Sequence, residues 1–351
     1  MAESRQKTRQ NAILQILSSR PQNAEFEIDE IHQILHDEYQ IQISQRTINR
    51  DLDKLQEQEL ITSQGQARAT VYFLTAPKKA QYFETNFTER QVQEEFNWDV
   101  FNKLKKQEEE IFAKHEQQQI CQAINLYRDN ILKTSPTLFK KELERLTIEF
   151  SWKSSQIEGC TYSVLETEAL IRYGRTADGK NIEEANMILN HKQAFDYVFA
   201  NSQYFERLNE HKIREVHQLL STNLNFTTGI RSIPVRITGT RYMPLDNEHQ
   251  ITEALEQSCD LINSIEEPVA KALCALSLIS YIQAFEDGNK RTARLIANAI
   301  LLAYEICPLS YRSADKGDYK RALVYFYEQN DLLLIKDLFL KQFLDAANNY
   351  F

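Results

Sequence analysis

The chain has few cysteines and no long apolar run. These two features argue against a disulfide-rich or zinc-binding protein and against a membrane-spanning one. Its five cysteines are scattered and have none of the paired spacings of zinc sites: Cys121, Cys160, Cys259, Cys274 and Cys307. An odd, scattered set in 351 residues indicates reduced thiols and no structural metal. No apolar run could span a bilayer, and residues 1–5 are polar, unlike a signal peptide. We therefore expect a cytoplasmic protein with no membrane partner.

Basic residues are also in deficit. The 41 lysines and arginines are outnumbered by 50 aspartates and glutamates, which gives a formal net charge of −9. This balance argues against non-specific binding along nucleic acid, although a local basic patch remains an alternative. With 42% hydrophobic and 26% charged residues, the composition is that of a soluble globular protein, long enough for two or three domains.

The most informative motif lies at residues 283–294, which read Gln-Ala-Phe-Glu-Asp-Gly-Asn-Lys-Arg-Thr-Ala-Arg. The apolar run at 272–282 predicts a buried helix before it, and helical spacing resumes at 291–304. The sequence Asp-Gly-Asn at 287–289 predicts a tight loop between the two helices. Such a loop exposes unpaired N–H groups at the positive end of a helix dipole, where phosphates bind readily.

Charged residues around this loop suit a phosphate ligand. Arg291 and Arg294 are three residues apart, so both guanidinium groups can reach one side of the helix and bind successive phosphates. Asp287 offers the hard oxygen ligand that Mg²⁺ accepts when phosphates complete its shell. The alternative interpretation is an ordinary loop between two core helices.

The ordered set Phe285, Asp287, Gly288, Asn289, Arg291 and Arg294 resembles the signature loop of the Fic (Fido) family. In that family the loop reads His-Pro-Phe-x-Asp/Glu-Gly-Asn-Gly-Arg-x-x-Arg, and its members typically transfer AMP from ATP to a target hydroxyl. The resemblance implies a mainly α protein, with an all-helical core and a β-hairpin flap. It also implies ATP and Mg²⁺ as cofactors, Asp287 as the metal ligand, Gly288 and Asn289 as the anion hole, and both arginines as phosphate clamps.

Three positions depart from the family pattern. Gln283 stands where the family has its catalytic histidine, Ala284 replaces proline, and Lys290 replaces the second glycine. General-base help from a histidine is typically worth ~10²–10⁴ in rate, and an amide cannot supply it. Gln283 can still hydrogen-bond a hydroxyl or a phosphate, so nucleotide binding can survive where transfer is weakened. Lys290 adds a cation that either strengthens nucleotide binding or crowds the loop.

A second motif lies at the end of the helix expected at about residues 138–159. Ser154 and Glu158, followed by Gly159, resemble the inhibitory Ser/Thr-x-x-x-Glu-Gly/Asn motif of the family. In that reading Glu158 forms an ion pair with Arg294 and disfavours a productive ATP pose. The alternative is an ordinary helix end with a solvated glutamate.

Residues 229–243 read as a β-hairpin with a glycine in its turn. The family has its flap at this point, and the segment 235–243 could take an extended part of a target protein as an added strand. A surface hairpin without a partner is the alternative. The family also has an aromatic near adenine. Tyr319 is the candidate here, and an ordinary half-buried tyrosine is the alternative.

The first 78 residues have their own periodicity. Three helical segments, the third starting after Ser44, precede two strands at 60–62 and 71–74. The segment 44–52 resembles the recognition helix of winged helix-turn-helix regulators of the DeoR type, which implies a small α+β domain. In this comparison a set of polar residues faces DNA: Gln45, Arg46, Asn49 and Arg50 on the helix, and Arg68 on the wing. Protein docking is the alternative use of such a domain.

These observations predict a winged helix domain at 1–78, a helical arm at 79–135 and a Fic domain at 136–351. The arm, expected as one or two helices, could be a spacer, a homodimerisation element or a packing partner of the core. Two functions stay open. One is an auto-inhibited protein adenylyltransferase weakened by Gln283. The other is a nucleotide-responsive, DNA-binding regulator whose Fic domain has lost catalysis.

Overall fold

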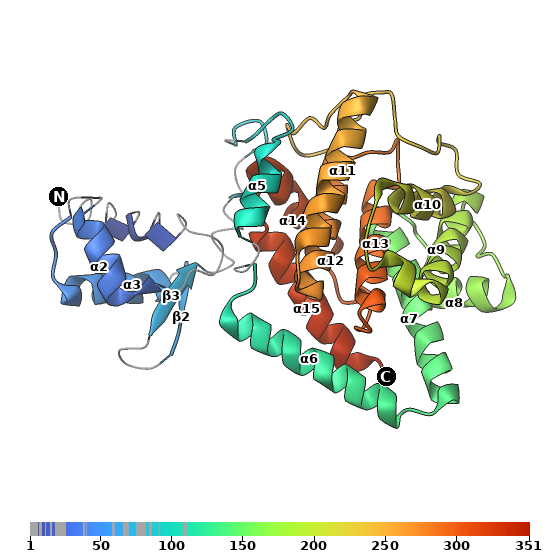
Figure 1. Cartoon of the computed structure of the whole chain (residues 1–351), viewed down its shortest axis with the longest axis horizontal. Coiled ribbons are helices and arrows are strands. Elements are labelled where there is room, and N and C mark those ends of the chain that lie inside the picture. The colour runs from blue at the N-terminus through green and yellow to red at the C-terminus, as the bar shows by residue number, and fades with distance from the viewer. Residues whose placement is uncertain are drawn as a thin grey trace. The chain divides into compact units, whose positions relative to one another are not determined.

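The structure, a computed structural model, describes most of the chain. The described ranges are 26–37, 41–57, 60–65, 70–74, 86–90, 92–107 and 111–351, with residues 6, 9, 10, 12–14, 16, 17, 39, 82 and 83 outside them. Two compact units are present. One is formed by Met1–Arg90 with Glu109–Lys114, and the other by Gln91–Glu108 with His115–Phe351 (Figure 1).

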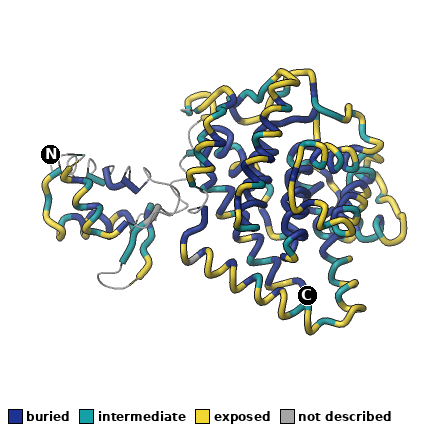
Figure 2. Tube along the Cα trace, in the orientation of Figure 1, coloured by how far each residue is buried: buried dark blue, intermediate teal, exposed yellow. Residues whose placement is uncertain are grey.

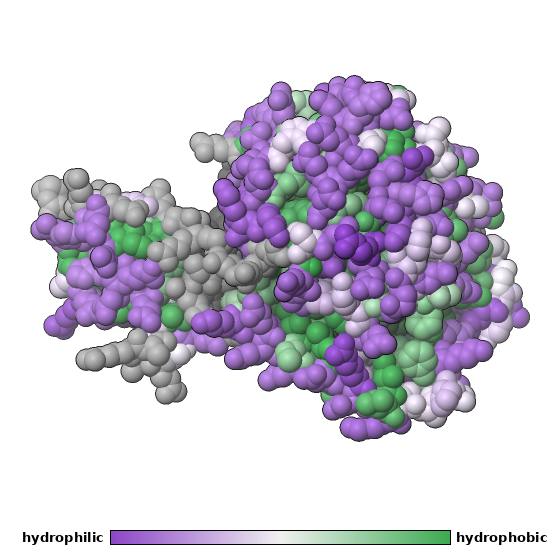
Figure 3. All heavy atoms as spheres, in the orientation of Figure 1, coloured by the Kyte–Doolittle hydropathy of each residue, from purple (hydrophilic) through white to green (hydrophobic). Residues whose placement is uncertain are grey.

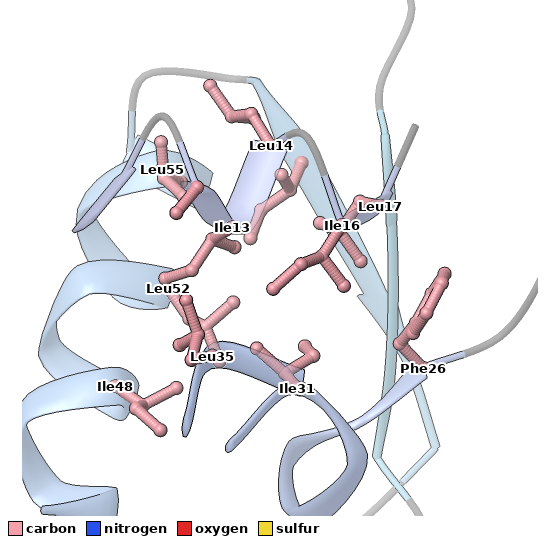
Figure 4. Packing of buried hydrophobic residues seen from close by; sticks show 12 residues of the cluster. Ile13, Leu14, Ile16, Leu17, Phe26, Ile31, Leu35, Ile48, Leu52 and Leu55 are labelled. Carbon is pink, nitrogen blue, oxygen red and sulfur yellow. The ribbon is translucent and has the colours of Figure 1, made fainter. Parts of the chain in front are cut away.

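The first unit combines helices with a small sheet. Its elements are β1 (Phe26–Glu27), α2 (Ile28–Asp37), α3 (Gln45–Glu57), β2 (Ile61–Gln64) and β3 (Val71–Leu74). The antiparallel sheet has the order β1-β3-β2, so the two predicted strands pair, and the two-residue β1, too short to leave a pattern, was not predicted. Buried aliphatic side chains fill its core, among them Ile13, Ile31, Leu35, Ile48 and Leu52 (Figure 4).

Helix α3 begins where the sequence predicts. The Oγ atom of Ser44 lies 3.4 Å from the amide nitrogen of Thr47, as an N-cap requires. The described residues between 9 and 17 are helical, while other residues of the first predicted helix lie outside the described part. Residues 66–69, which belong to the loop expected at 63–69 and include the DNA contact expected at Arg68, also lie outside it.

The second unit is built of helices. They are α5 (Asp99–Lys106), α6 (Lys114–Lys133), α7 (Pro136–Ile157), α8 (Val164–Tyr173), α9 (Ile182–Ala200), η3 (Ser202–Phe205), α10 (Glu210–Ser221), α11 (Glu248–Ser264), α12 (Pro268–Ile282), α13 (Asn289–Ala303), α14 (Lys316–Gln329) and α15 (Leu333–Asn349). The expected mainly α fold is therefore present. The segment predicted as one or two helices before residue 135 contains two, α5 and α6, in its described part.

Helices α12 and α13 form the centre of this unit. Every residue from Val269 to Ile282 is buried, because α12 is covered by α11, α14 and α15 (Figure 2). Helix α13 packs against α12 and is covered by α7, α9 and α10. The turn between these two buried helices, residues 283–288, is the first half of the motif at 283–294. A rigid core thus positions both ends of the motif.

Helix α7 has clear signals at both ends. Ser135 caps its start by accepting a hydrogen bond from the amide of Leu138 at 3.3 Å, and Pro136 occupies the first helical position. The helix ends at Ile157, and Gly159 has a φ of 114°, which L side chains rarely adopt. The helix was expected to reach about residue 159, and it ends just before Glu158.

The β-hairpin expected at 229–243 is not formed. The turn at Thr238-Gly239 is present, but the flanking segments make no ladder with each other, and Met243 instead forms an isolated bridge with Glu95. Pro234 and Pro244 lack the N–H groups that a ladder needs. The side chain of Arg231 instead donates to the carbonyls of Ile233, at 2.7 Å, and of Leu245. One arginine therefore holds the two arms of this flap segment, residues 229–247.

Hydrophilic residues predominate on the face seen in Figure 3. Among the described helices, none is long and apolar enough to cross a bilayer.

Candidate active site

The turn between α12 and α13 has the backbone of an anion site. Gln283 ends α12 in the left-handed conformation, with φ 52° and ψ 53°, and Gly288 precedes α13 with φ 80°. No side chain caps the start of α13, so its first N–H groups remain available to a ligand. A Cβ atom at position 288 would lie 3.4 Å from the ring of His217, in addition to the strain of a positive φ.

Asn289 and His217 hold this turn. The side-chain oxygen of Asn289 accepts from the amide of Phe285 at 2.9 Å, and its NH₂ group donates to the carbonyl of Phe285 at 2.8 Å. His217 of α10 stacks on the Phe285 ring, with centroids 3.7 Å apart and planes 7° apart. Its Nε2 atom lies 2.9 Å from the carbonyl oxygen of Asp287, to which it must donate because a carbonyl only accepts. Asn289 thus shapes the anion hole through its side chain, leaving its backbone for the ligand.

A cavity of about 270 Å³ opens over the turn. Its lining includes most of the predicted site residues: Glu158, Gln283, Asp287, Gly288, Asn289, Lys290 and Arg291. The flap segment adds residues 235–238, and α14 adds Lys320, Leu323, Val324 and Tyr327. Most of the charged groups therefore gather at the turn, while the flap and α14 contribute aliphatic side chains together with the cations Arg236 and Lys320. This division suits a ligand with a charged end and a flat apolar end.

Arg291 is buried and still has hydrogen-bonding capacity. Its side chain is 1% exposed, and its Nη2 atom donates to Asp287 Oδ2 at 3.1 Å. The Nε and Nη1 atoms are buried and have no hydrogen-bond partner. Burial lowers the pKa of Arg291, but arginine stays charged in proteins. Unpaired buried donors cost free energy, and a phosphate oxygen would satisfy them.

Arg294 is held by α7 through its Nε and Nη2 atoms, while its buried Nη1 atom has no hydrogen-bond partner. Its Nε atom donates to Ser154 Oγ at 2.9 Å, and its Nη2 atom donates to the Ser154 carbonyl at 2.9 Å and to Glu158 Oε1 at 2.8 Å. The predicted ion pair between Glu158 and Arg294 is therefore confirmed. Arg294 is 0% exposed and does not line the cavity, whereas Glu158 does. Glu158 thus stands between Arg294 and any ligand.

Two cations hold the carboxylate of Glu158. Lys290 Nζ lies 3.5 Å from Glu158 Oε2, so the residue that replaces the family glycine contacts the glutamate. Burial by itself would raise the pKa of Glu158, but Arg294 and Lys290 outweigh it and lower the pKa from 4.5 to about 2. The carboxylate is charged at neutral pH.

His191 of α9 completes this cluster and was not found from the sequence. Its Nδ1 atom lies 2.9 Å from the carbonyl oxygen of Met187, and its Nε2 atom lies 2.8 Å from Ser154 Oγ. A carbonyl only accepts, so Nδ1 carries the proton and Nε2 accepts from the serine hydroxyl. The serine oxygen is then left to accept from Arg294. Burial lowers the pKa of His191 to about 3, which keeps it neutral. A lone histidine in a helix carries no motif that could reveal this role.

Gln283 is buried at the end of α12 and lines the cavity. Its side chain is turned back, because Nε2 donates to the carbonyl of Ser280 at 2.5 Å. Its own carbonyl accepts from Arg231 Nε at 2.7 Å, which ties the motif to the flap segment. Tyr319, expected near adenine or half-buried, is 0% exposed and packs its ring 5.1 Å from the guanidinium carbon of Arg294. Tyr327 lines the cavity in its place.

Among the described residues, the carboxylate of Asp287 is placed to hold a metal ion together with a bound phosphate. The described residues contain no group of three or more histidine, cysteine or acidic side chains that could hold a metal by themselves. Asp287 has a side chain that is 65% exposed beside the anion hole. This fits Mg²⁺, which is commonly held by one or two carboxylates together with substrate phosphates and water.

The polar residues expected to face DNA lie on the first unit. Arg46, Asn49 and Arg50 are exposed on α3 and line, with Thr47 and Asp53, a surface hollow of about 410 Å³. Gln45 is exposed too, but its side chain donates to Asp29 Oδ1 at 2.5 Å. Three of the four helix residues therefore share one open face.

Comparisons with known proteins agree with this architecture. Residues 207–301 match the model of the Fic/DOC family. The protein adenylyltransferase Fic of Nematostella vectensis is 27% identical over 188 residues, covering 51% of this chain and 43% of that protein. The protein adenylyltransferase fic-1 of Caenorhabditis elegans is 23% identical over 193 residues, covering 53% and 38%. The chain thus spans less than half the length of each of these relatives.

Solved structures share the fold. Fic-1 from C. elegans superposes with a TM-score of 0.59 at 20% identity, covering 67% of this chain and 71% of that one. A Fic-domain signalling protein from Bacteroides thetaiotaomicron superposes with a TM-score of 0.57 at 22% identity, covering 66% and 94%. The helical unit around the α12–α13 turn therefore has the fold of these Fic-domain proteins, and its residues 207–301 match the Fic/DOC family model.

Proposed function

We propose that this chain is a protein adenylyltransferase of the Fic type, which binds Mg·ATP at the α12–α13 turn and is held inactive by Glu158. The contact of Glu158 with Arg294 carries this proposal. A buried arginine beside an anion hole is held by a carboxylate from another helix, which a phosphate would have to displace. The names of the relatives support AMP transfer as the reaction.

The residues of the cavity divide the work of binding. Arg291 has two donors without a partner that could bind phosphate oxygens, and the first N–H groups of α13, which no side chain caps, would add to them. Asp287 would hold the metal ion, which when bound neutralises phosphate charge. Arg294 would bind the terminal phosphate once Glu158 has moved away. The aliphatic side chains of the flap and α14 would take the base.

In the transfer step, the oxygen of a target hydroxyl forms a bond to the α-phosphorus, and the bond to the β-phosphate oxygen breaks, so pyrophosphate leaves. The hydroxyl proton has to leave in the same step, and without a basic side chain at position 283 it would pass to solvent water. The amide of Gln283 can accept a hydrogen bond from that hydroxyl but cannot take its proton, so we propose transfer slower by ~10²–10⁴ than with a histidine. A target segment would lie along the flap at 235–243, in which residues 235–242 belong to no strand or bridge.

The experiment uses α-labelled ATP and Mg²⁺ with the full chain and cell lysate. We expect weak label on target or chain with Glu158→Gly, and strong label when Gln283→His is added. Label only in the double variant would support a lapsed transferase. If neither variant nor the parent chain binds ATP in calorimetry, the proposal is wrong.

A second candidate function is a nucleotide-responsive regulator that binds DNA through α3. The open face with Arg46, Asn49 and Arg50 favours it, because two cations and an amide are the side chains that read guanine and adenine. In a gel-shift assay on the gene's own promoter region, Arg46→Ala and Arg50→Ala should weaken binding. Lys54→Ala, on the same helix but outside the hollow, is the control. Failure of the parent chain to shift this DNA would count against the second candidate.

A further inference from the structure

A second cavity lies between the end of α7 and the start of α14, outside the candidate active site. Its volume is about 590 Å³, and three cations line it: Lys153, Arg312 and Lys316. Asp315 is the acidic residue of the lining. We call it the α7–α14 cavity.

Lys153 is the most informative of these cations. The residue is 9% exposed, and its Nζ atom donates to the neutral amide oxygen of Gln156 at 2.9 Å. The ammonium also lies 5.3 Å from the centre of the Trp152 ring. Among the described residues, Lys153 forms no ion pair, and its pKa is lowered because burial outweighs the opposing effect of the Asp315 charge. Lysines are rarely this buried without an anionic partner.

The other charged groups leave the cavity positive. Asp315 is engaged by the start of α14, because its Oδ1 atom accepts from the amide of Asp318 at 2.9 Å. Arg312 contacts Glu149 only at 3.4 Å and is 36% exposed. Lys316 is the first residue of α14, where the helix dipole also favours an anion, and no described carboxylate pairs with it.

We propose that the α7–α14 cavity binds a phosphate-class anion, either inorganic or carried by a small metabolite. Lys153, Lys316 and Arg312 would each direct N–H groups to its oxygens, and charge-assisted hydrogen bonds of this kind are the strong ones. The anion would supply the charge that Lys153 lacks.

The position of this cavity implies coupling to the active site. Helix α7 leads from Lys153 to Glu158, and α14 leads from Lys316 to Lys320 and Tyr327, which line the active-site cavity. An anion bound to both Lys153 and Lys316 would link α7 to α14. It would therefore alter the relative stability of the positions of Glu158 and of the α14 residues that line the active-site cavity. Coupling is reciprocal, so ATP should alter anion affinity by the same factor. This coupling rests on the proposed function, whereas anion binding does not.

The test uses tryptophan fluorescence of the full chain. The sequence has two tryptophans, and Trp98→Phe leaves Trp152, beside Lys153, as the reporter. Titration with inorganic phosphate and with pyrophosphate, at constant ionic strength, should give a saturable change in emission. Lys153→Met and Lys316→Gln should each weaken the apparent affinity by about tenfold, whereas Arg291→Gln should leave it unchanged.

Two results would overturn the inference. One is no saturable response in the Trp98→Phe chain with either anion. The other is a response that survives both lysine substitutions and disappears with Arg291→Gln, which would mean that the anion binds at the active site. Lys316 is only partly buried, so Lys316→Gln keeps the test valid if Lys153→Met fails to fold. Because ATP binding is measured separately, an anion response without ATP binding supports this site and contradicts the proposed function.

Discussion

Arg294 makes three hydrogen bonds to the α7 segment in this structure, through its Nε and Nη2 atoms, while its buried Nη1 atom has no hydrogen-bond partner. Ser154 accepts from it twice, and Glu158 takes the remaining bond of its Nη2 atom at 2.8 Å. A ligand phosphate would compete with Glu158 for this arginine, since both need the same donor. Because both would bind the same buried guanidinium, ATP affinity should depend strongly on the side chain at position 158.

Replacing Glu158 should therefore increase ATP affinity. We expect Glu158→Gly to lower the Kd for ATP roughly tenfold, because a charged hydrogen bond is worth on the order of 1.5–3 kcal/mol. Isothermal titration calorimetry with and without Mg²⁺ measures it. Glu144→Gln, an exposed change on the same helix, is the matched control and should leave the Kd unchanged. Weaker binding by the Glu158 variant would show that this carboxylate helps to hold the nucleotide.

Lys290 offers a test that separates two roles. If it secures Glu158, as its 3.5 Å contact indicates, Lys290→Met should strengthen ATP binding by about threefold, in line with a partly exposed ion pair. A lysine that binds phosphate would instead lose affinity on this change. The effect should vanish in a Glu158→Gly background, which a double-mutant cycle measures.

At this scale the sequence predicted the pair formed by Glu158 and Arg294, because both belong to motifs with fixed spacing. It did not reveal His191 or His217. Each is a single histidine on an amphipathic helix, and the partners that define its role come from segments far away in the chain. Lys290 was expected beside the phosphate loop and lies in the first turn of α13, but its contact with Glu158 depends on a rotamer that sequence does not encode.

The flap segment is the element that the sequence described least well. The alternation around Val235 and Ile237, with Gly239 in a turn, is typical of a hairpin, and the turn is present. The ladder is absent, and Pro234 and Pro244 cannot donate to one; the buried Arg231 instead joins the two arms through the carbonyls of Ile233 and Leu245. The long helices were easier to predict, since their caps and apolar spacing are local signals.

Arg231 should therefore control the mobility of the flap. We expect Arg231→Met to speed amide hydrogen exchange at least tenfold in residues 229–247 and at Gln283 to Phe285, because the guanidinium bridges both segments. Arg236→Met, in the same segment, is the control. Unchanged exchange in the Arg231 variant, measured by mass spectrometry, would mean that packing alone holds the flap.

For the molecule as a whole, the sequence predicted the mainly α fold and a small α+β N-terminal unit with its strand pair, because helix spacing and turn residues are distributed throughout the chain. The functional roles of the two units stay predictions. The helical unit also buries two neutral histidines, which gives it an acid sensitivity that composition alone does not predict.

Stability should fall as the pH drops below about 6.5. Burial lowers the pKa of His191 to about 3 and that of His217 to about 4, so both are neutral when folded but protonated when unfolded. A depressed pKa contributes stability above the unfolded value and loses it on acidification, at roughly 1.4 kcal/mol per group and pH unit. Urea unfolding at pH 7 and pH 5 measures the loss.

A matched pair of variants checks the cause. His217→Phe, which keeps a ring against Phe285, should reduce the loss between pH 7 and pH 5 by about 2 kcal/mol. His249→Gln, at an exposed site on α11, should leave it unchanged. An equal loss in both variants would assign the acid sensitivity to other groups.

Ser154 grips Arg294 through both its hydroxyl and its carbonyl, independently of Glu158. If Glu158 swings away, the guanidinium keeps two of its three bonds and stays aimed at the vacated position. If Glu158 were released, the Arg294 guanidinium would already be oriented to bind a phosphate, with little further loss of side-chain freedom. A switch of this design would respond as quickly as one carboxylate can rotate.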